Sequence, residues 1–141
     1  MVQAYASNRV VFGVLRLIPN VLFTTDASSS WGMGGFLSGQ RFAVSWEELR
    51  AMPQKPVYPF SNQESSHINY LELFAVYWAI TQFGGGLRGM RVPLYVDNQS
   101  TEPMVRNLRA KSAHFIALLK EIHIMLIRFN LRVDVRYINT K

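Results

Sequence analysis

Residues 21–37, VLFTTDASSSWGMGGFL, decide the fold of this chain. An apolar run ends at Asp26, four small residues follow, and a second run, 31–37, then returns. We interpret this pattern as a hairpin of two strands joined by a tight connection. The glycines of the second run leave little side-chain bulk, and glycine inside a strand often marks a close approach by a ligand or another chain.

Asp26 is the first candidate functional residue. A carboxylate beside a bare strand surface can meet a metal ion or a phosphate chain. The alternative is that Asp26 begins the turn and caps its backbone, as aspartate often does. This stretch alone leaves both interpretations open.

The composition is that of a globular protein. With 141 residues and 49% apolar content, the chain is of single-domain size and can bury a core, which argues against disorder. No apolar run approaches the roughly 20 residues that span a bilayer, and the N-terminus lacks a signal pattern. The absence of cysteine excludes disulfides and thiolate metal sites. We expect no membrane association and an intracellular location, cytoplasmic or nuclear.

The net charge of +6 is unevenly distributed. Residues 1–86 hold five Lys/Arg and five Asp/Glu, whereas residues 87–141 hold ten and four. A basic half attached to a neutral half is typical of a protein with a polyanionic partner. An ordinary solvated basic face is the alternative.

The first part of the chain has the pattern of an antiparallel meander. Residues 10–18, VVFGVLRLI, are β-branched and apolar, and they indicate either a strand or the end of an upstream domain. After residue 37, Ser38-Gly39-Gln40 is a hairpin turn signal, and residues 41–46 form the next expected strand. We expect residues 47–66, which contain three prolines, to be irregular.

A buried helix is expected at residues 69–83. Asn69 is a good N-cap, and Glu72 follows at capping-box spacing, so Glu72 has a structural interpretation as part of the cap. The helix carries apolar residues on most sides, which predicts burial all round. His67, just before it, is interpreted as a loop or cap residue rather than a metal ligand, since it has no partner at helical spacing.

A strand at residues 91–96 ends in front of Asp97. Pro93 within it predicts an edge position or a bulge. Residues 98–101 open a further helix, and Asp97 is either the anion at that helix start or a functional carboxylate.

The last helix begins after Ser112 and ends near Asn130. Its main apolar stripe repeats at three and four residues, at Phe115, Leu118, Leu119, Ile122, Met125, Leu126 and Phe129. Ile116, Ile124 and Ile127 lie off that stripe, which indicates either deep burial or a partner domain. Residues 131–138 alternate and predict the final strand.

The element order β-β-β-α-β-α-α-β indicates an α/β protein with a mixed sheet and helices packed on it. If the first and fourth strands are neighbours, Asp26 and Asp97 meet at one edge, and the first helix can bring Glu72 there. Three carboxylates together need cations to stay ionised. An oxygen-only donor set suits Mg²⁺ or Mn²⁺, and two such ions support phosphoryl transfer.

Three motifs in this order resemble a known family. They are T-D-A-S-x-x-W-G at residues 25–32, H-I-N-x-L-E-L-x-A at residues 67–75 and Y-V-D-N at residues 95–98. The chain resembles the ribonuclease H domain of retroelement reverse transcriptases, of the type found in tyrosine-recombinase retrotransposons and related pararetroviral elements. The resemblance implies a ribonuclease H-like fold with a five-stranded mixed sheet in the order 3-2-1-4-5. It also implies that residues 21–141 form this domain and that residues 1–20 are an N-terminal extension or a linker from an upstream domain.

The resemblance also implies an activity and its residues. That activity is hydrolysis of the RNA strand in an RNA–DNA hybrid, with Asp26, Glu72 and Asp97 as the catalytic acids that bind two Mg²⁺ ions, or Mn²⁺. Candidate contacts to the nucleic acid are Ser28, Ser29, Ser30, Asn98, Gln99, Arg106, Arg109 and Lys111. The partners implied are the hybrid itself and a polymerase domain of the same polyprotein, or another protein domain.

The sequence departs from the family at its end. The family carries a fourth acid on a helix after the last strand, whereas this sequence reads Tyr137-Ile138-Asn139-Thr140-Lys141 there. We therefore expect a domain truncated before its final helix and poorly active in Mg²⁺. A non-catalytic interaction module, docked on a polymerase or a ribonucleoprotein, is the alternative. An integrase-like nuclease is disfavoured, because such enzymes place their glutamate after the last strand.

Overall fold

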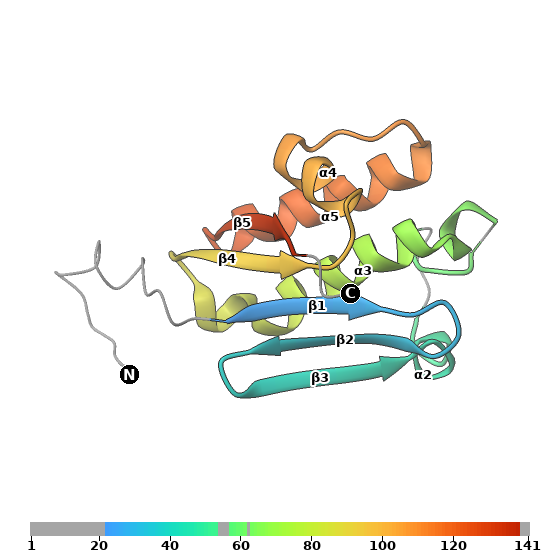
Figure 1. The fold of residues 1–141 in the computed structure, drawn as a ribbon, viewed down its shortest axis with the longest axis horizontal. Helices are drawn as coiled ribbons and strands as arrows, with labels where there is room; N and C mark the ends of the chain where they lie inside the picture. Colours follow the sequence, from blue (N-terminus) through green and yellow to red (C-terminus); the bar gives the residue numbers. More distant parts are fainter. Residues whose placement is uncertain (1–21, 54–56, 62, 139–141) are drawn as a thin grey trace, which may run out of the picture.

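The computed structural model describes residues 22–53, 57–61 and 63–138, and it consists of one sheet with helices on it (Figure 1). The strands are β1 (Phe23–Ala27), β2 (Gly32–Leu37), β3 (Gln40–Ser45), β4 (Arg91–Val96) and β5 (Arg132–Tyr137). The α-helices are α2 (Trp46–Arg50), α3 (Ile68–Phe83), α4 (Thr101–Asn107) and α5 (Ala113–Arg128). Two 3₁₀ turns, Glu64–Ser66 and Gly84–Leu87, flank α3.

The sheet has the order β3-β2-β1-β4-β5, which confirms the order expected from the resemblance. β1, β2 and β3 form an antiparallel meander, and β4 and β5 continue it as parallel strands. The meander turns at Ser38 and Gly39, both with positive φ, as in the type I′ turns that match the twist of a hairpin.

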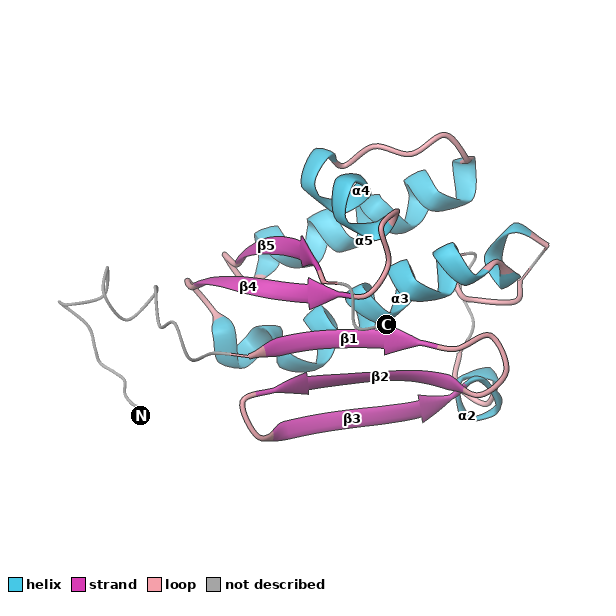
Figure 2. Cartoon of the chain, viewed as in Figure 1, coloured by secondary structure: helices cyan, strands magenta, loops and turns pink. Residues whose placement is uncertain are grey.

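The two long helices lie on one face of the sheet, behind the strands in the view of Figures 1 and 2. Along β1 and β4, side chains that face the helices alternate with side chains on the other face of the sheet. Phe23 and Thr25 of β1 are buried beneath the helices, and Val92, Leu94 and Val96 of β4 are buried with them. Thr24 and Asp26 therefore lie on the opposite face of β1, as the two-residue period of a strand requires.

The α3 helix is buried along most of its length, as its all-round apolar sequence predicts. Edge-to-face aromatic contacts hold its last residue and its middle: Phe83 packs on Phe23 of β1, and Phe74 packs on Tyr58 of the preceding loop. The Tyr70 hydroxyl donates a hydrogen bond to the Val57 carbonyl, and burial raises the Tyr70 pKa. The loop before α3 is thus tied to the core.

The α5 helix packs through its main apolar stripe, and the deep burial left open for Ile116, Ile124 and Ile127 is wrong because all three are exposed. Leu118, Leu119 and Ile122 are buried, and the αL residue Asn130 follows the helix end. The Ser112 hydroxyl caps its first turn by accepting from the His114 amide at 3.2 Å. None of the described helices is long and apolar enough to cross a membrane.

The structure corrects the expectation that residues 47–66 are irregular throughout, because α2 begins at Trp46. Ser45 accepts from the Glu48 amide at 3.0 Å, and Glu48 accepts from the Ser45 amide at 2.9 Å. This reciprocal capping box starts a helix of one turn. The hydrogen bonds from the Ser45 amide and hydroxyl lower the Glu48 pKa.

The expected capping box at Asn69 and Glu72 is wrong. The helix begins one residue earlier, and His67 is the N-cap, with its Nδ1 accepting from the Asn69 amide at 3.2 Å. His67 is thus a cap residue, as expected. Glu72 lies in the second turn of α3 and is buried, so the capping role no longer accounts for it.

The edge position expected from Pro93 is also wrong, since β4 lies between β1 and β5. Pro93 is tolerated because the registered pairs of β4 with β1 begin only at Tyr95. On that side of Pro93 no ladder partner requires an amide hydrogen.

The glycines of β2 serve the sheet itself. A Cβ on Gly32 would lie 2.1 Å from the Val44 carbonyl oxygen, and one on Gly35 would lie 2.2 Å from the Phe42 ring. The close approach expected at these positions is therefore made by β3. The strand expected at residues 10–18 lies outside the described residues.

Candidate active site

Asp26 and Asp97 lie side by side at the carboxyl ends of adjacent strands. Thr25 of β1 is registered with Val96, the last residue of β4, and each of the two aspartates is the next residue along the chain. Asp26 is exposed, and its Oδ1 accepts from the Ala27 amide at 3.0 Å. Asp97 is half-buried. This parallel pair confirms the neighbourhood of the first and fourth strands on which the sequence argument depends.

Glu72 approaches the same edge from the helix layer. It lies in the second turn of α3, and the residue is only 7% exposed. In Figure 1 the start of α3 lies at the arrowhead ends of β1 and β4. This burial shows that Glu72 is not an ordinary solvated surface carboxylate.

A pair of asparagines joins the start of α3 to the turn after β4. The Asn98 Nδ2 donates to the Asn69 Oδ1 at 3.0 Å. The Asn98 Oδ1 accepts from the Ser100 amide at 2.9 Å and the Thr101 amide at 3.0 Å. Asn98 thereby holds the turn that leads into α4, whose N-cap is Ser100.

The carboxylates share one edge of the sheet without forming a closed ligand shell. No three His, Asp or Glu side chains within the described ranges stand close enough together to hold a metal ion. Their all-oxygen donor set has the chemistry that Mg²⁺ and Mn²⁺ select.

The serines after Asp26 form a rigid turn. The Ser28 hydroxyl accepts from the Trp31 amide at 3.1 Å, and the Ser28 carbonyl accepts from the Trp46 indole at 2.7 Å. Ser28 is therefore used by the fold. Ser29 and Ser30 are exposed and line a hollow of about 480 Å³ against α2.

Trp31 lines the same hollow, and sequence reasoning did not single it out as a contact residue. Its side chain is 54% exposed, although its backbone is held on both sides. Its amide donates to Ser28, and its carbonyl accepts from the Trp46 amide at 2.9 Å. The sequence feature that could have identified Trp31 is its position in the motif at residues 25–32, five residues after Asp26.

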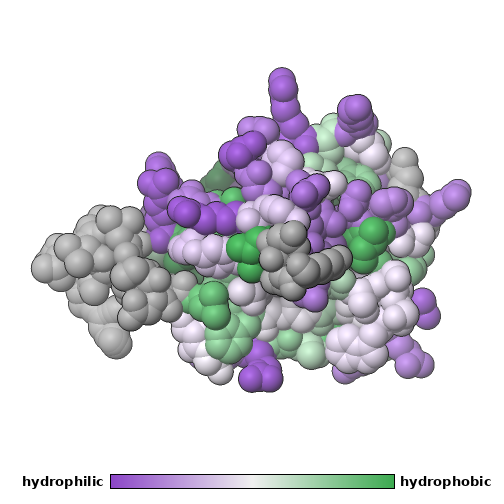
Figure 3. Space-filling model, in the orientation of Figure 1, coloured by the Kyte–Doolittle hydropathy of each residue, from purple (hydrophilic) through white to green (hydrophobic). Residues whose placement is uncertain are grey.

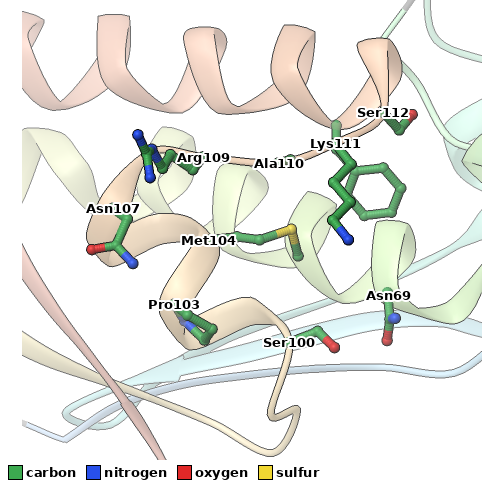
Figure 4. Close-up of a pocket in the computed structure, with 10 residues that line it drawn as sticks. Asn69, Ser100, Pro103, Met104, Asn107, Arg109, Ala110, Lys111 and Ser112 are labelled. Carbon is green, nitrogen blue, oxygen red and sulfur yellow. The ribbon is translucent and has the colours of Figure 1, made fainter.

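Two of the three candidate cations gather in a second hollow, of about 680 Å³, between the starts of α3, α4 and α5 (Figure 4). The hollow is lined by Asn69, Ser100, Pro103, Met104, Asn107, Arg109, Ala110, Lys111, Ser112 and Phe115. In Figure 4 the Lys111 side chain extends into it toward Asn69, and the Arg109 guanidinium lies near Asn107. The floor is apolar and the rim is basic.

The remaining candidates lie apart from that hollow. Arg106 is paired with Glu102 at 2.8 Å on the surface of α4, and Gln99 is exposed in the turn before α4. Figure 3 shows polar side chains concentrated over the half of the molecule that holds β4, β5 and α4. These elements belong to the basic 87–141 segment of the sequence.

Comparison with known proteins identifies the architecture. A solved structure, ribonuclease H1 from the halophilic archaeon Halobacterium salinarum NRC-1, superposes with a TM-score of 0.58 at 13% identity. The match covers 85% of this chain and 86% of that one. The chain has the ribonuclease H-like fold. No protein-family model and no curated protein sequence matches it, so the ribonuclease H-like assignment rests on the structure.

Proposed function

We propose that this chain is a ribonuclease H-type endonuclease domain that cleaves the RNA strand of RNA–DNA hybrids, as part of a reverse transcriptase. One observation carries the proposal: the ribonuclease H-like topology brings Asp26, Asp97 and the start of the Glu72 helix to the same edge of the sheet. The solved ribonuclease H1 with the same fold supports the reaction class by analogy.

The three carboxylates are the residues that would hold the metal. Bound there, two Mg²⁺ ions would polarise the scissile phosphate and activate the attacking water. The protein's own contribution would be to hold the three carboxylates near one end of the sheet. Asp26 and Asp97 do so from strand ends whose register is fixed, and Glu72 does so from a helix that cannot shift without opening the core.

The hybrid would lie along the edge that carries the carboxylates. On one side Ser29, Ser30 and Trp31 line the hollow against α2, and an exposed indole offers a stacking surface for a base. On the other side Arg109 and Lys111 rim the hollow of Figure 4 and supply positive charge for phosphates. Contacts to 2′-hydroxyls would distinguish the RNA strand.

The direct test is cleavage of an end-labelled RNA–DNA hybrid in Mg²⁺ and in Mn²⁺. We expect products with 5′-phosphate and 3′-hydroxyl ends, no cleavage of duplex DNA, and higher activity in Mn²⁺ than in Mg²⁺, because Mg²⁺ demands near-ideal octahedral geometry from the three carboxylates. Asp26→Asn should abolish cleavage and leave the fold intact, since it removes one of three mutually repelling charges. Cleavage at the wild-type rate by this variant contradicts the proposal.

A specific observation supports the second candidate, a non-catalytic interaction module. The outer strip of α5 exposes Ile116, Ile124 and Ile127 by 38%, 45% and 65%, and a hollow of about 330 Å³ lies beside the first two. Apolar strips of this kind often mark a protein interface. For such a module, Ile124→Glu would abolish association with the polymerase domain in size-exclusion chromatography, and Asp26→Asn would change nothing.

A further inference from the structure

We propose that the Asn69–Asn98 hydrogen bond is a positioning device that sets the distance between Glu72 and Asp97, and with it the affinity of the carboxylate edge for divalent cations. The inference rests on the proposed function. It assigns a role to two residues that touch neither the cation nor the scissile phosphate in that proposal, and it revises the expectation that Asn98 serves as a donor to nucleic acid.

The first step is the placement of the pair. Asn98 directly follows Asp97, and Asn69 precedes Glu72 by three residues in the same helix. Residues three apart in a helix lie on one face, so Asn69 and Glu72 point to the same side of α3. The 3.0 Å bond between the two amides therefore links the helix face that carries Glu72 to the turn that carries Asp97.

The second step is the orientation of the bond. The Asn98 Oδ1 faces three donors, namely the Ser100 amide at 2.9 Å, the Thr101 amide at 3.0 Å and the Thr101 hydroxyl at 3.2 Å. This oxygen cannot exchange places with Nδ2 without losing both backbone-amide bonds, because an N–H group cannot accept. Nδ2 must point to Asn69, which has to present an acceptor, so the direction of the bond is fixed by the fold.

The third step is rigidity on both sides. On the helix side, His67 caps the amide of Asn69, and Tyr70 is fully buried with its hydroxyl bonded to Val57. On the turn side, Thr101 is fully buried at the start of α4. A link between two fixed elements determines their separation. Residues that orient metal ligands from behind typically contribute about 10- to 100-fold to metal affinity.

The test measures Mn²⁺ binding to the protein without nucleic acid, by the loss of the free-ion signal in electron paramagnetic resonance. Asn69→Ala removes the acceptor and leaves the three bonds of the Asn98 oxygen in place. We expect it to weaken Mn²⁺ binding by about tenfold or more. The matched control is Gln82→Ala, which truncates an exposed amide at the other end of α3 and should bind Mn²⁺ as the wild type does. Equal melting temperatures without metal separate positioning from a loss of stability.

A second pair of variants separates positioning by the Asn69–Asn98 hydrogen bond from the effect of added negative charge on Mn²⁺ binding. Asn69→Asp keeps an acceptor for the Asn98 amide and adds one negative charge, so it should retain or improve Mn²⁺ binding. Combining it with Asn98→Asp adds a second charge but leaves two acceptors facing each other. If the link positions the site, the double variant binds Mn²⁺ more weakly than Asn69→Asp alone. If charge alone governs binding, the double variant binds more tightly, and the inference is overturned.

The outcomes distinguish this inference from the proposed function. Mn²⁺ binding by the wild type that Asn69→Ala does not weaken overturns the positioning role alone. A wild-type protein that binds no Mn²⁺, or binds it equally after Asp26→Asn, overturns the carboxylate site and the positioning role together.

Discussion

The helices α3 and α5 have the same length, 16 residues, and opposite relations to the core. Eleven residues of α3 are buried, against three of α5. A helix enclosed on most sides cannot rotate or slide without breaking the core, so a polar group on it has a fixed position. A helix held by one stripe leaves its other sides available to solvent or a partner.

Each of the two helices carries one carboxylate, and the two carboxylates differ in burial as the helices do. Glu72 of α3 is buried at the edge where Asp26 and Asp97 end their strands. Glu121 of α5 is half-buried and lies near Tyr77. Chemically identical side chains on helices of equal length thus have different expected roles, which makes them a matched pair for experiment.

The largest expected effect is on catalysis. Glu72→Gln should reduce hybrid cleavage more than about 100-fold, because a direct ligand contributes more than the residues that merely orient ligands. Glu121→Gln, the matched control, should cleave at the wild-type rate. Both variants are measured in single-turnover reactions with an excess of protein. A Glu72→Gln enzyme as fast as Glu121→Gln would show that burial of Glu72 serves packing alone.

The next effect is on stability, and it compares two isoleucines. Ile80 of α3 is fully buried, and Ile127 of α5 is 65% exposed. Ile80→Ala should lower the free energy of unfolding by about 2–5 kcal/mol, because it leaves a cavity in the core. Ile127→Ala should change it by less than about 0.5 kcal/mol. Urea unfolding followed by circular dichroism measures both, and equal losses would mean that the outer strip of α5 is covered.

The difference between the helices also explains which parts of this fold were predictable from the sequence. Both helices, the hairpin at residues 21–37 and the strand-end positions of Asp26 and Asp97 follow from local patterns of apolar and small residues. Such patterns have the period of the structure they form. The pairing of β1 with β4 was only a condition of the argument from residues, and the strand order itself came from the family resemblance. The nearby S-x-x-E pattern at Ser45–Glu48 was equally local, yet the prolines after it obscured the short helix.

The remaining features depend on tertiary contacts that no local pattern contains. The burial of Glu72 could not be separated from a cap role, because Asn69 and Glu72 also have capping-box spacing. The actual cap, His67, uses a ring nitrogen that ranks below Asn as a cap. The Asn69–Asn98 bond joins residues 29 apart and exists only because β4 lies beside β1. Likewise, the sequence could not place Arg109 and Lys111 around one hollow, because the hollow forms only when the starts of α3, α4 and α5 come together.

A smaller effect is expected where the two helices begin beside each other, at the hollow of Figure 4. Replacing Arg109 and Lys111 together by Gln should lower the slope of log affinity against log salt by up to about 2, because each phosphate contact contributes about 0.9. The matched control replaces Lys120 and Arg128 of α5, which lie outside this hollow. Fluorescence anisotropy with a labelled hybrid in Ca²⁺ measures the slopes. Equal slopes for the two pairs would place the nucleic acid elsewhere.

The smallest effect concerns the contact between the helices. Burial and the nearby Glu121 carboxylate of α5 raise the pKa of Tyr77 on α3 above its usual value of about 10. At pH values between the unfolded and folded pKa, the native state keeps the proton that the unfolded state loses. The free energy of unfolding therefore falls as pH rises through this interval, and the contribution is fully present below it. Tyr70 adds a decrease of the same sign.

Tyr77→Phe removes one of these two contributions, so its stability should fall less steeply above about pH 10 than that of the wild type. Glu121→Gln should also reduce the slope, by less, because burial rather than Glu121 is the main cause of the raised pKa. Tyr137→Phe, on the exposed end of β5, is the control and should keep the wild-type slope. Urea unfolding at several pH values from about 8 to 11 measures all four proteins. A Glu121→Gln slope equal to that of the wild type would show that the two helices pack here without electrostatic coupling, and a Tyr77→Phe slope equal to it would assign the whole decrease to Tyr70.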